Sequence, residues 1–575
     1  MVVGRLSPRT TRLQRCDDDG TPIEGPDDLP DDAVAARIAA EEASVAPRWV
    51  WDDTGRWYPA LLGAGVRVAR AHDLRLSRAI LRLSSLTAGS GYALAPSSVW
   101  DEQPAAGRPP ERDTPLFGFG DEFSADEGSA VAPEDFAETE AELRRQLAVV
   151  AAVPGGGRLR LLLAAESSGA LIAAEMHAAG LPWSTERHGD VLTDALGPRV
   201  AAGERPRRMQ DLVDRIRVIL DDPQVNPDSQ QDLLRSIRRA GILATSTRAW
   251  ELQEIDHPVI EPLLEYKKLA RLLSANGWTW MDTWIVDGRF RPEYVPGGAA
   301  TGRWATSGGG ALQLPRQVRS AVRADPGWKL VVADAAQLEP RILAALSADE
   351  AMAAAGRGTD LYAGIQATGV VDTRAHAKVA MLGAMYGATT GESGQLLPRL
   401  ARAYPRAIAL VEHAARAGER GESVTSWLGR SSPRPSAAWD AVQARASDAD
   451  ASEADERRAR SQARDWGRFT RNFVVQSTAA EWALCWMAEL RKTLAGLSAD
   501  GASPGVLDGT VFASRPHLVF FLHDEVVVHA PAAIAEATAA AVTAAAERAG
   551  RLLFGGFPVD FPLGVAIVDD YAEAK

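Results

Sequence analysis

A stretch near the end of the chain sets three polar residues between two apolar runs. Residues 519–522 are apolar throughout, and so are residues 526–528. His523, Asp524 and Glu525 stand between them. Short β-branched and aromatic runs around a polar break are typical of two strands joined by a tight turn. The pattern predicts a buried hairpin that holds two adjacent acids, although a polar turn that merely faces water is the alternative for these three residues alone.

Asp334 is a second acid at a predicted strand end. Residues 329–333 form a short, mostly apolar strand, and a helix is expected to begin near Pro340, because the missing N–H of proline suits a first helical turn. We expect the hairpin to bring Asp524 beside Asp334. Two such carboxylates repel each other unless a cation lies between them, and oxygen ligands favour Mg²⁺. Two Mg²⁺ ions about 3.5–4 Å apart are standard machinery for displacement at phosphorus.

A helix with a cationic stripe, ending at Gly387, is predicted for the segment TRAHAKVAMLGAMYGATTG. Four residues spaced four apart share one slanted face: Arg374, Lys378, Leu382 and Tyr386. Cations clamp a triphosphate, and an apolar or aromatic surface takes a sugar or a base. A solvated basic end on an otherwise packed helix explains the same pattern equally well.

A second helix is predicted for the segment DWGRFTRNFVVQSTAAEWALCWMAEL. Arg468, Asn472 and Gln476 are spaced four apart on one face of it. An arginine and two amides on one stripe can contact template or primer edges in the minor groove. A polar face turned to solvent is the alternative.

Taken in order, these segments resemble the polymerase portion of family A DNA polymerases, the bacterial DNA polymerase I type. The resemblance covers roughly residues 160–575, with NPDSQQDLL and LLEYKKLARLLSANG similar to thumb-side segments. Five motifs carry it in the correct order: TGRWATSGGGALQLPR, DAAQLEPRILAALS (motif A), RAHAKVAMLGAMYG (motif B), NFVVQSTAAE and LHDEVVV (motif C).

The resemblance implies an α+β fold, a right-hand polymerase of palm, fingers and thumb with a small N-terminal exonuclease-like α/β domain. The expected boundaries follow the motifs. They are 1–155 for a degenerate 3′-5′ exonuclease-like domain with flexible acidic segments, 156–290 for the thumb and connecting helices, 291–350 for the palm with motif A, 351–480 for the fingers with motif B, and 481–575 for the palm with motif C.

The resemblance also assigns a metal site and a catalytic centre. Asp334 and Asp524 would bind two Mg²⁺ ions, with Mn²⁺ as a substitute, and the backbone carbonyl of Ala335 would be a further ligand. Glu525 would lie beside them near the primer terminus. The family has Tyr-Ser where this chain has Ala335 and Ala336, but neither alanine removes a carboxylate ligand.

Nucleotide and DNA contacts come from the same motifs. The catalytic cations Arg374 and Lys378 would bind the incoming triphosphate and stabilise charge on the leaving pyrophosphate. The implied nucleotide site comprises Arg374, Lys378, Leu382, Tyr386, Glu339 and Gln337, with Glu339 as the steric gate against a ribose 2′-OH and Leu382 in place of the family's aromatic residue. The implied DNA contacts are Arg303, Gln476, Asn472, Arg468 and His523.

The front of the chain resembles a proofreading domain only weakly. Residues 1–45 are predicted to be a loosely ordered acidic segment, and residues 100–135 a linker. Asp52 or Asp53 matches one exonuclease acid, although two solvated acids in a turn are the simpler interpretation. No opening strand with a DxE pair is found before Arg48. We expect a shortened remnant without exonuclease activity that serves as a structural support.

Composition narrows the remaining choices. The net charge of −13 argues against a uniformly basic coat protein but permits an enzyme with a local basic groove. Two cysteines give no disulfide framework, and no apolar segment is long enough to span a membrane. We therefore expect a cytoplasmic protein, and the resemblance implies a nucleoid-associated monomer that binds primer-template DNA and dNTPs.

The main hypothesis is a template-directed DNA polymerase for repair or gap filling. Because Leu382 and the alanine pair depart from the family, a catalytically weak relative that binds primer-template DNA as a scaffold is the second. An active exonuclease that uses the acids of residues 48–76 is the third.

Overall fold

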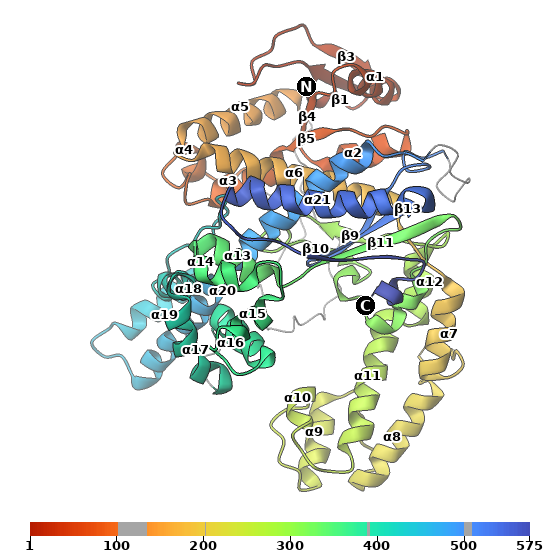
Figure 1. Ribbon diagram of the computed structural model, residues 1–575, viewed down its shortest axis with the longest axis vertical. Coiled ribbons are helices and arrows are strands. Elements are labelled where there is room, and N and C mark those ends of the chain that lie inside the picture. The colour runs from red at the N-terminus through yellow and green to blue at the C-terminus, as the bar shows by residue number, and fades with distance from the viewer. Residues whose placement is uncertain (102–134, 202, 388–390, 500–508, 575) are drawn as a thin grey trace. The chain divides into compact units, whose positions relative to one another are not determined.

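The computed structural model describes residues 1–101, 135–201, 203–387, 391–499 and 509–574 (Figure 1). Contacts between residues divide the chain into two compact units. Unit 1 comprises Met1–Ala179, Glu293–Gly308 and Pro326–Ile567, and unit 2 comprises Gly180–Pro292, Gly309–Asp325 and Val568–Lys575. Each unit is described by itself.

Unit 1 begins with a five-stranded sheet in the order β3-β2-β1-β4-β5. Strand β1 pairs with β2 antiparallel and with β4 parallel, and β5 continues the parallel half. The strands are β1 (Val2–Ser7), β2 (Thr10–Gln14), β3 (Asp27–Pro30), β4 (Arg48–Trp51) and β5 (Arg70–Asp73). The helices are α1 (Asp31–Ser44), α2 (Thr54–Gly63), α3 (Leu74–Leu83), α4 (Gly91–Leu94), α5 (Phe136–Ala152) and α6 (Gly156–Ala179), with a 3-10 turn, η1 (Val99–Asp101).

The predicted disorder of residues 1–45 is wrong, because three strands and α1 occupy this segment. Its acids have partners. Arg12 pairs with Asp28 at 2.6 Å, and Arg37 pairs with Asp27 at 2.8 Å. Acidic composition alone does not reveal that arginines elsewhere in the segment neutralise the charge. The predicted linker lies almost entirely outside the described residues.

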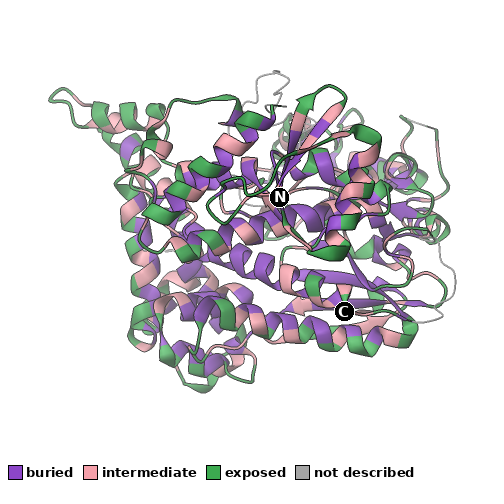
Figure 2. Cartoon of the chain, turned by 90° about the horizontal axis from the view of Figure 1, so that it is seen from above, coloured by how far each residue is buried: buried purple, intermediate pink, exposed green. Residues whose placement is uncertain are grey.

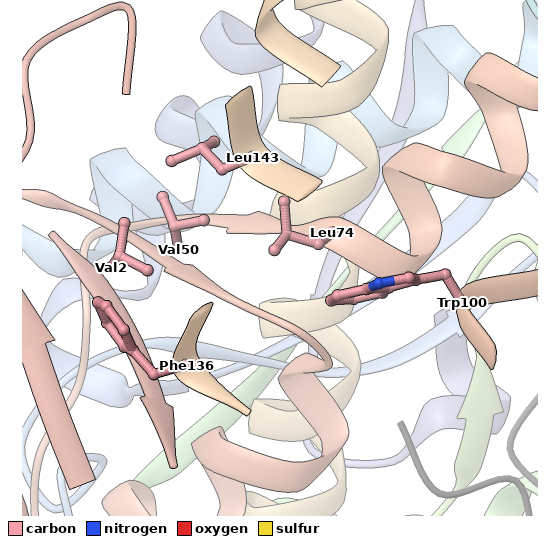
Figure 3. Close-up of a cluster of buried hydrophobic side chains, with 6 residues drawn as sticks. All are labelled: Val2, Val50, Leu74, Trp100, Phe136 and Leu143. Atoms are coloured by element: carbon pink, nitrogen blue, oxygen red, sulfur yellow. The ribbon is translucent and has the colours of Figure 1, made fainter. Parts of the chain in front are cut away.

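A compact apolar cluster holds this sheet against its helices (Figure 3). The side chains come from β1, β4, α3, η1 and α5, and each is at most 6% exposed. They are Val2, Val50, Leu74, Trp100, Phe136 and Leu143. Because the cluster joins residues from Val2 to Leu143, the N-terminal segment folds as one body rather than as separate loops.

A second sheet of unit 1 has the order β12-β13-β11-β14. Its strands are β11 (Trp328–Ala335), β12 (His517–Leu522), β13 (Glu525–Pro531) and β14 (Leu563–Val568). Strands β12 and β13 form the predicted hairpin, which the structure confirms, and β13 pairs antiparallel with β11. Helix α21 (Ala535–Phe554) packs against this sheet and against α20. A two-stranded sheet, β9 (Glu293–Val295) and β10 (Ala305–Gly308), completes the strands of this unit.

Helices make up the rest of unit 1. Helix α16 matches the predicted motif B helix, and Thr373 caps its start by accepting from His376 N at 3.0 Å. Helix α20 is longer than predicted, and Ser452 and Asp455 form a capping box at its start. The helices are α13 (Leu338–Ser347), α14 (Glu350–Gly356), α15 (Leu361–Ala367), α16 (Arg374–Tyr386), α17 (Gly391–Ala403), α18 (Pro405–Glu419), α19 (Ala437–Ala446) and α20 (Glu453–Ala495).

Unit 2 is mostly helical. Its three-stranded sheet has the order β6-β8-β7, from β6 (Leu181–Pro182), β7 (Ile285–Val286) and β8 (Arg289–Phe290). The helices are α7 (Thr185–Leu196), α8 (Arg207–Leu220), α9 (Gln230–Arg239), α10 (Ala249–Leu252), α11 (Ile260–Asn276) and α12 (Trp278–Trp284), and the 3-10 turns include η3 (Arg316–Ala321) and η5 (Tyr571–Ala574).

The division into palm, fingers and thumb stays a prediction. The expected thumb, 156–290, begins before unit 2, because α6 packs within unit 1 against α2 and α20. Figure 2 shows buried residues along several strands and on one face of many helices, with exposed residues on the opposite face of those helices. Among the described helices, none is long and apolar enough to cross a membrane.

Candidate active site

Two acids meet where β11 ends beside the hairpin turn. Asp334 is the second-last residue of β11, and it lies opposite Glu525, the first residue of β13. One residue further, the Ala335 N–H donates to the carbonyl of Asp524 over 3.0 Å. His523 begins the two-residue turn with φ near +60°, a left-handed conformation that tight hairpin turns require. The predicted proximity of Asp334 and Asp524 is therefore present in the backbone.

The three acids differ in burial. Glu525 is only 1% exposed, whereas Asp334 and Asp524 are half-buried. Among the described residues, no group of three or more His, Cys, Asp or Glu side chains gathers closely enough to hold a metal alone. Mg²⁺ is usually bound by one or two carboxylates together with substrate phosphates. Two half-buried carboxylates and the carbonyl of Ala335 at a stiff strand end fit that kind of incomplete site.

Glu339 connects two other predicted residues. Its carboxylate forms an ion pair with Arg303, from the β9–β10 loop, and accepts a hydrogen bond from the Tyr386 hydroxyl at the end of α16. Burial and the neighbouring Glu339 charge raise the pKa of Tyr386, and Gln476 of α20 also contacts its hydroxyl. Four separate segments thus meet around the Glu339 carboxylate and the Tyr386 hydroxyl: the β9–β10 loop, α13, α16 and α20.

His523, in the turn of the β12–β13 hairpin, lies near Arg303 and Glu339. Desolvation and the positive charge of Arg303 lower the pKa of His523, although the residue as a whole is exposed. Arg303 and Glu339 therefore both lie near the turn that carries Asp524. The structure brings together Arg303, Glu339, Tyr386, Gln476 and His523, while their roles stay predictions.

The start of α16 carries the predicted phosphate cations. Arg374 forms a bidentate pair with Asp360, at 2.7 and 3.2 Å, and lies over the Tyr362 ring. Lys378 is exposed and forms no ion pair with any side chain that the structure describes. Leu382 is half-buried one turn further on. The stripe predicted from the spacing is present, with one cation paired and one open to solvent.

The Gln337 side chain forms hydrogen bonds with other residues of the protein. It lies just before α13 with φ near +50°, and its side-chain N–H donates to Asp360 at 3.0 Å. Its side-chain oxygen accepts from Leu361 N at 3.2 Å and from Arg341 at 3.3 Å. Asp360 therefore joins Gln337 to Arg374. Sequence reasoning did not single out Asp360, although an acid just before a short helical run is a recognisable cap signal.

The remaining predicted DNA contacts lie on α20. Arg468 pairs with Asp465 on the same helix, and its stem packs against Gly387 at the end of α16. Asn472 is half-buried, and its side-chain oxygen accepts no hydrogen bond from the described residues. Both side chains lie on the same stripe of the helix as Gln476.

The acids at the front of the chain already have structural roles. Asp52 accepts from Trp57 Nε1 at 2.6 Å and pairs with Arg56 at 2.9 Å. Asp53 caps α2 through Gly55 N at 2.8 Å and pairs with Arg75 at 3.0 Å. The opening strand β1 reads VVGRLS and contains no acid.

Comparisons with known proteins identify the family. Residues 204–568 match the family described as DNA polymerase family A, so the chain belongs to family A of the DNA polymerases. It is 26% identical over 392 residues to the thermostable DNA polymerase I of Thermus filiformis, which covers 62% of this chain and 41% of that protein. It is 31% identical over 217 residues to the DNA polymerase I of Chloroflexus aurantiacus, which covers 32% of this chain and 22% of that protein.

The fold agrees with the family. A solved structure of the POL domain of Pol1 from M. smegmatis, in complex with DNA primer-template and dNTP, superposes with a TM-score of 0.67. That likeness covers 99% of this chain and 96% of the other, at 17% sequence identity. The predicted α+β polymerase fold is thereby confirmed. The chain spans about two fifths or less of the length of these curated relatives.

Proposed function

We propose that this chain is a template-directed DNA polymerase that adds dNTPs to a primer 3′-OH by two-metal-ion nucleotidyl transfer. The observation that carries the proposal is the meeting of Asp334 and Asp524, fixed by the antiparallel register of β11 and β13 and by the Ala335–Asp524 backbone bond. Membership of family A supports the same conclusion.

Asp334, Asp524 and the Ala335 carbonyl would hold two Mg²⁺ ions, with Mn²⁺ as a substitute. When bound, these ions would activate the primer hydroxyl and neutralise charge on the leaving pyrophosphate. The buried β13 strand stiffens the turn, so both carboxylates are presented without reorganisation. Glu525, buried at the first position of that strand, would lie beside them near the primer terminus.

Arg374 and Lys378 would bind the triphosphate. Lys378 is exposed and ready for a phosphate, whereas Arg374 would exchange the carboxylate of Asp360 for the incoming anion. A guanidinium binds carboxylate and phosphate in the same forked geometry, so this exchange needs no new conformation of the helix.

Glu339 would close the sugar side of the nucleotide site. Its carboxylate is held by Arg303 and Tyr386, so it cannot swing away to admit a 2′-OH. Arg303 and Gln476 would contact the minor-groove edge of the primer terminus, where every base pair offers an acceptor. Asn472 and Arg468 would occupy template-side and active-site polar positions.

Proofreading would be absent. The front acids are tied to Trp57, Arg56, Gly55 and Arg75, and β1 supplies no acid for a metal pair. A polymerase without proofreading suits short synthesis, so we propose a role in repair or gap filling. Its oligomeric state and location stay predictions from the sequence.

A DNA-binding scaffold is the second candidate. Leu382 stands where the family has an aromatic residue, and Ala335 and Ala336 replace a Tyr-Ser pair. A weaker sugar contact would reduce nucleotide affinity and leave DNA binding intact.

Primer extension on a 5′-labelled primer-template with Mg²⁺ separates these candidates. Three reactions contain dNTPs, rNTPs or no nucleotide, and each is repeated with Asp524→Ala. Extension with dNTPs by the wild type alone supports the polymerase, and an intact primer without nucleotide supports absent proofreading. Tight DNA binding without extension in any reaction would leave the scaffold.

A further inference from the structure

A short segment of unit 1, residues 424–432, forms a hairpin that we call the strap. Thr425 and Ser431 form a β-bridge, and Ser426 N donates to Arg430 O at 2.8 Å. The strap is fastened to the N-terminal region, because Ser84 Oγ donates to Gly429 O at 2.7 Å. No motif in the sequence pointed to this segment.

The strap is also fastened to α20. The Glu481 carboxylate accepts a hydrogen bond from Ser426 Oγ and, at 3.0 Å, one from Leu428 N. Thr478 accepts from Trp427 N at 3.1 Å. The backbone of the strap therefore has a fixed position on the helix that carries Gln476.

Arg430 projects from this strap into a buried ion pair. Its guanidinium donates to Glu166 of α6 at 2.5 Å, with side-chain exposures of 11% and 1%. Burial raises the pKa of Glu166, and the Arg430 charge opposes that rise. A buried pair of this kind costs desolvation, and is often no more stable than an apolar replacement, so stability alone does not account for it.

The Arg430–Glu166 pair lies against the β9–β10 loop at two glycines. A Cβ at Gly302 would lie 2.7 Å from Arg430 Cζ, and a Cβ at Gly297 would lie 2.7 Å from Glu166 Oε1. Both glycines have φ in the left-handed region, at +78° and +65°. The loop backbone thus lies directly on the two charged groups, with no side chain between them.

Arg303 follows Gly302 on the same loop. Its carbonyl accepts from Ala299 N at 3.1 Å, which closes the loop, and its guanidinium reaches Glu339. A shift of the loop moves the Arg303 stem directly, because one peptide bond separates Arg303 from the residue that Arg430 contacts.

We propose that Arg430 and Glu166 are positioning residues for Arg303, and that through them the strap and α6 set the place of the guanidinium that contacts the primer terminus. This inference rests on the proposed polymerase function. It gives α6 and the strap a role in primer alignment in addition to packing.

The test is a double-mutant cycle in single-turnover primer extension. Arg430→Lys keeps the charge but loses the forked geometry, and Glu166→Gln keeps the shape but loses the charge. Each is expected to slow nucleotide addition on the order of tenfold, because small misplacements at a reacting centre are costly. In an Arg303→Ala background the same changes should cause little further loss, since the route through Arg303 is already broken.

A primer whose terminal purine has carbon in place of N3 gives a second readout. It lacks the minor-groove acceptor, so it should slow the wild type but not Arg430→Lys. A protein that is slow only because its fold is altered would instead remain as sensitive to the altered primer as the wild type is. Arg457→Lys, which changes an exposed pair with Glu453, is the matched control and should behave as the wild type.

The outcomes separate the two proposals. Additive losses in the Arg303→Ala background, or equal sensitivity of both proteins to the altered primer, would overturn this inference and leave the polymerase intact. No extension by the wild type would overturn both. If Arg430→Lys lowers the melting temperature sharply, Glu166→Gln carries the same cycle.

Discussion

The N–H of Ala335 donates to the carbonyl of Asp524 over 3.0 Å, which joins the end of motif A to the turn of motif C. The two segments are separated by almost 190 residues of chain, yet the antiparallel pairing of Asp334 with Glu525 leaves them no other register. The carboxylates are thus placed by backbone geometry. Side chains around them can change, as Ala335 and Ala336 do, without displacing the acids.

Replacing Glu339 should weaken sugar discrimination. Glu339→Ala removes the carboxylate that Arg303 and Tyr386 hold, which opens space for a 2′-OH and frees both partners. We expect the ratio of dNTP to rNTP incorporation to fall about tenfold or more, with a slower rate for dNTPs. Competitive primer extension measures the ratio, with Glu453→Gln as a surface control. An unchanged ratio would contradict the assignment of the steric gate.

The pH dependence of stability should report Glu481. Burial raises the pKa of Glu481 to about 7, above its value of 4.5 in an unfolded chain. Between pH 4.5 and about pH 7, Glu481 is therefore protonated in the folded state and has lost that proton in the unfolded state. The stabilising contribution is complete below about pH 4.5 and disappears as pH rises through about 7.

Glu481→Gln mimics the protonated form at every pH. Its melting temperature relative to the wild type should therefore be higher at pH 8 than at pH 5.5, measured by thermal unfolding in matched buffers. Equal differences at both pH values would show that Glu481 does not titrate in this window.

Asp52 and Asp53 should contribute to the stability of the protein and not to hydrolysis of DNA. Asp53→Ala removes the cap of α2 and should lower the free energy of unfolding by about 1 kcal/mol. With a 5′-labelled strand, Mg²⁺ and no dNTP, wild type and Asp53→Ala should both leave the strand intact. Degradation by the wild type that Asp52→Asn abolishes would revive the exonuclease.

The N-terminal region should stabilise the rest of unit 1. Buried Glu175 of α6 accepts from Tyr58 at 2.6 Å, from Arg67 at 2.9 Å and from Arg491 of α20 at 2.6 Å. Glu175→Gln leaves two arginines with a neutral partner, so the free energy of unfolding should fall by about 3–5 kcal/mol. Urea unfolding followed by tryptophan fluorescence measures it. A loss no larger than that of exposed Glu138→Gln would contradict this account.

The sequence located the parts of the site whose signals are local. Two apolar runs around a polar break predicted the hairpin around Asp524, and residues spaced four apart predicted the helix face that carries Arg374; both elements are present. The polar stripes followed from helical spacing. These features depend on neighbours within one or two turns, so a single sequence contains them.

The missed features depend on contacts between distant segments. Asp360 gains its place from Gln337 and Arg374, and Arg430 gains its place from Glu166 of α6. The order of residues 1–45 likewise comes from arginine partners and from the cluster around Phe136. Periodicity describes which face of an element is apolar, but not which element will cover it.

Single-turnover primer extension with Asp334→Asn and Asp524→Asn tests the central claim most directly. Asparagine keeps the size of each side chain and removes the charge that would hold Mg²⁺, so both variants should lose nucleotide addition by a factor of a hundred or more, on the order of the loss of a key electrostatic group. Their affinity for primer-template DNA should match that of the wild type. The surface control Glu453→Gln should match the wild type in both its rate of nucleotide addition and its DNA affinity. Retained extension by either variant at wild-type rate would contradict the metal site and, with it, the proposed polymerase mechanism.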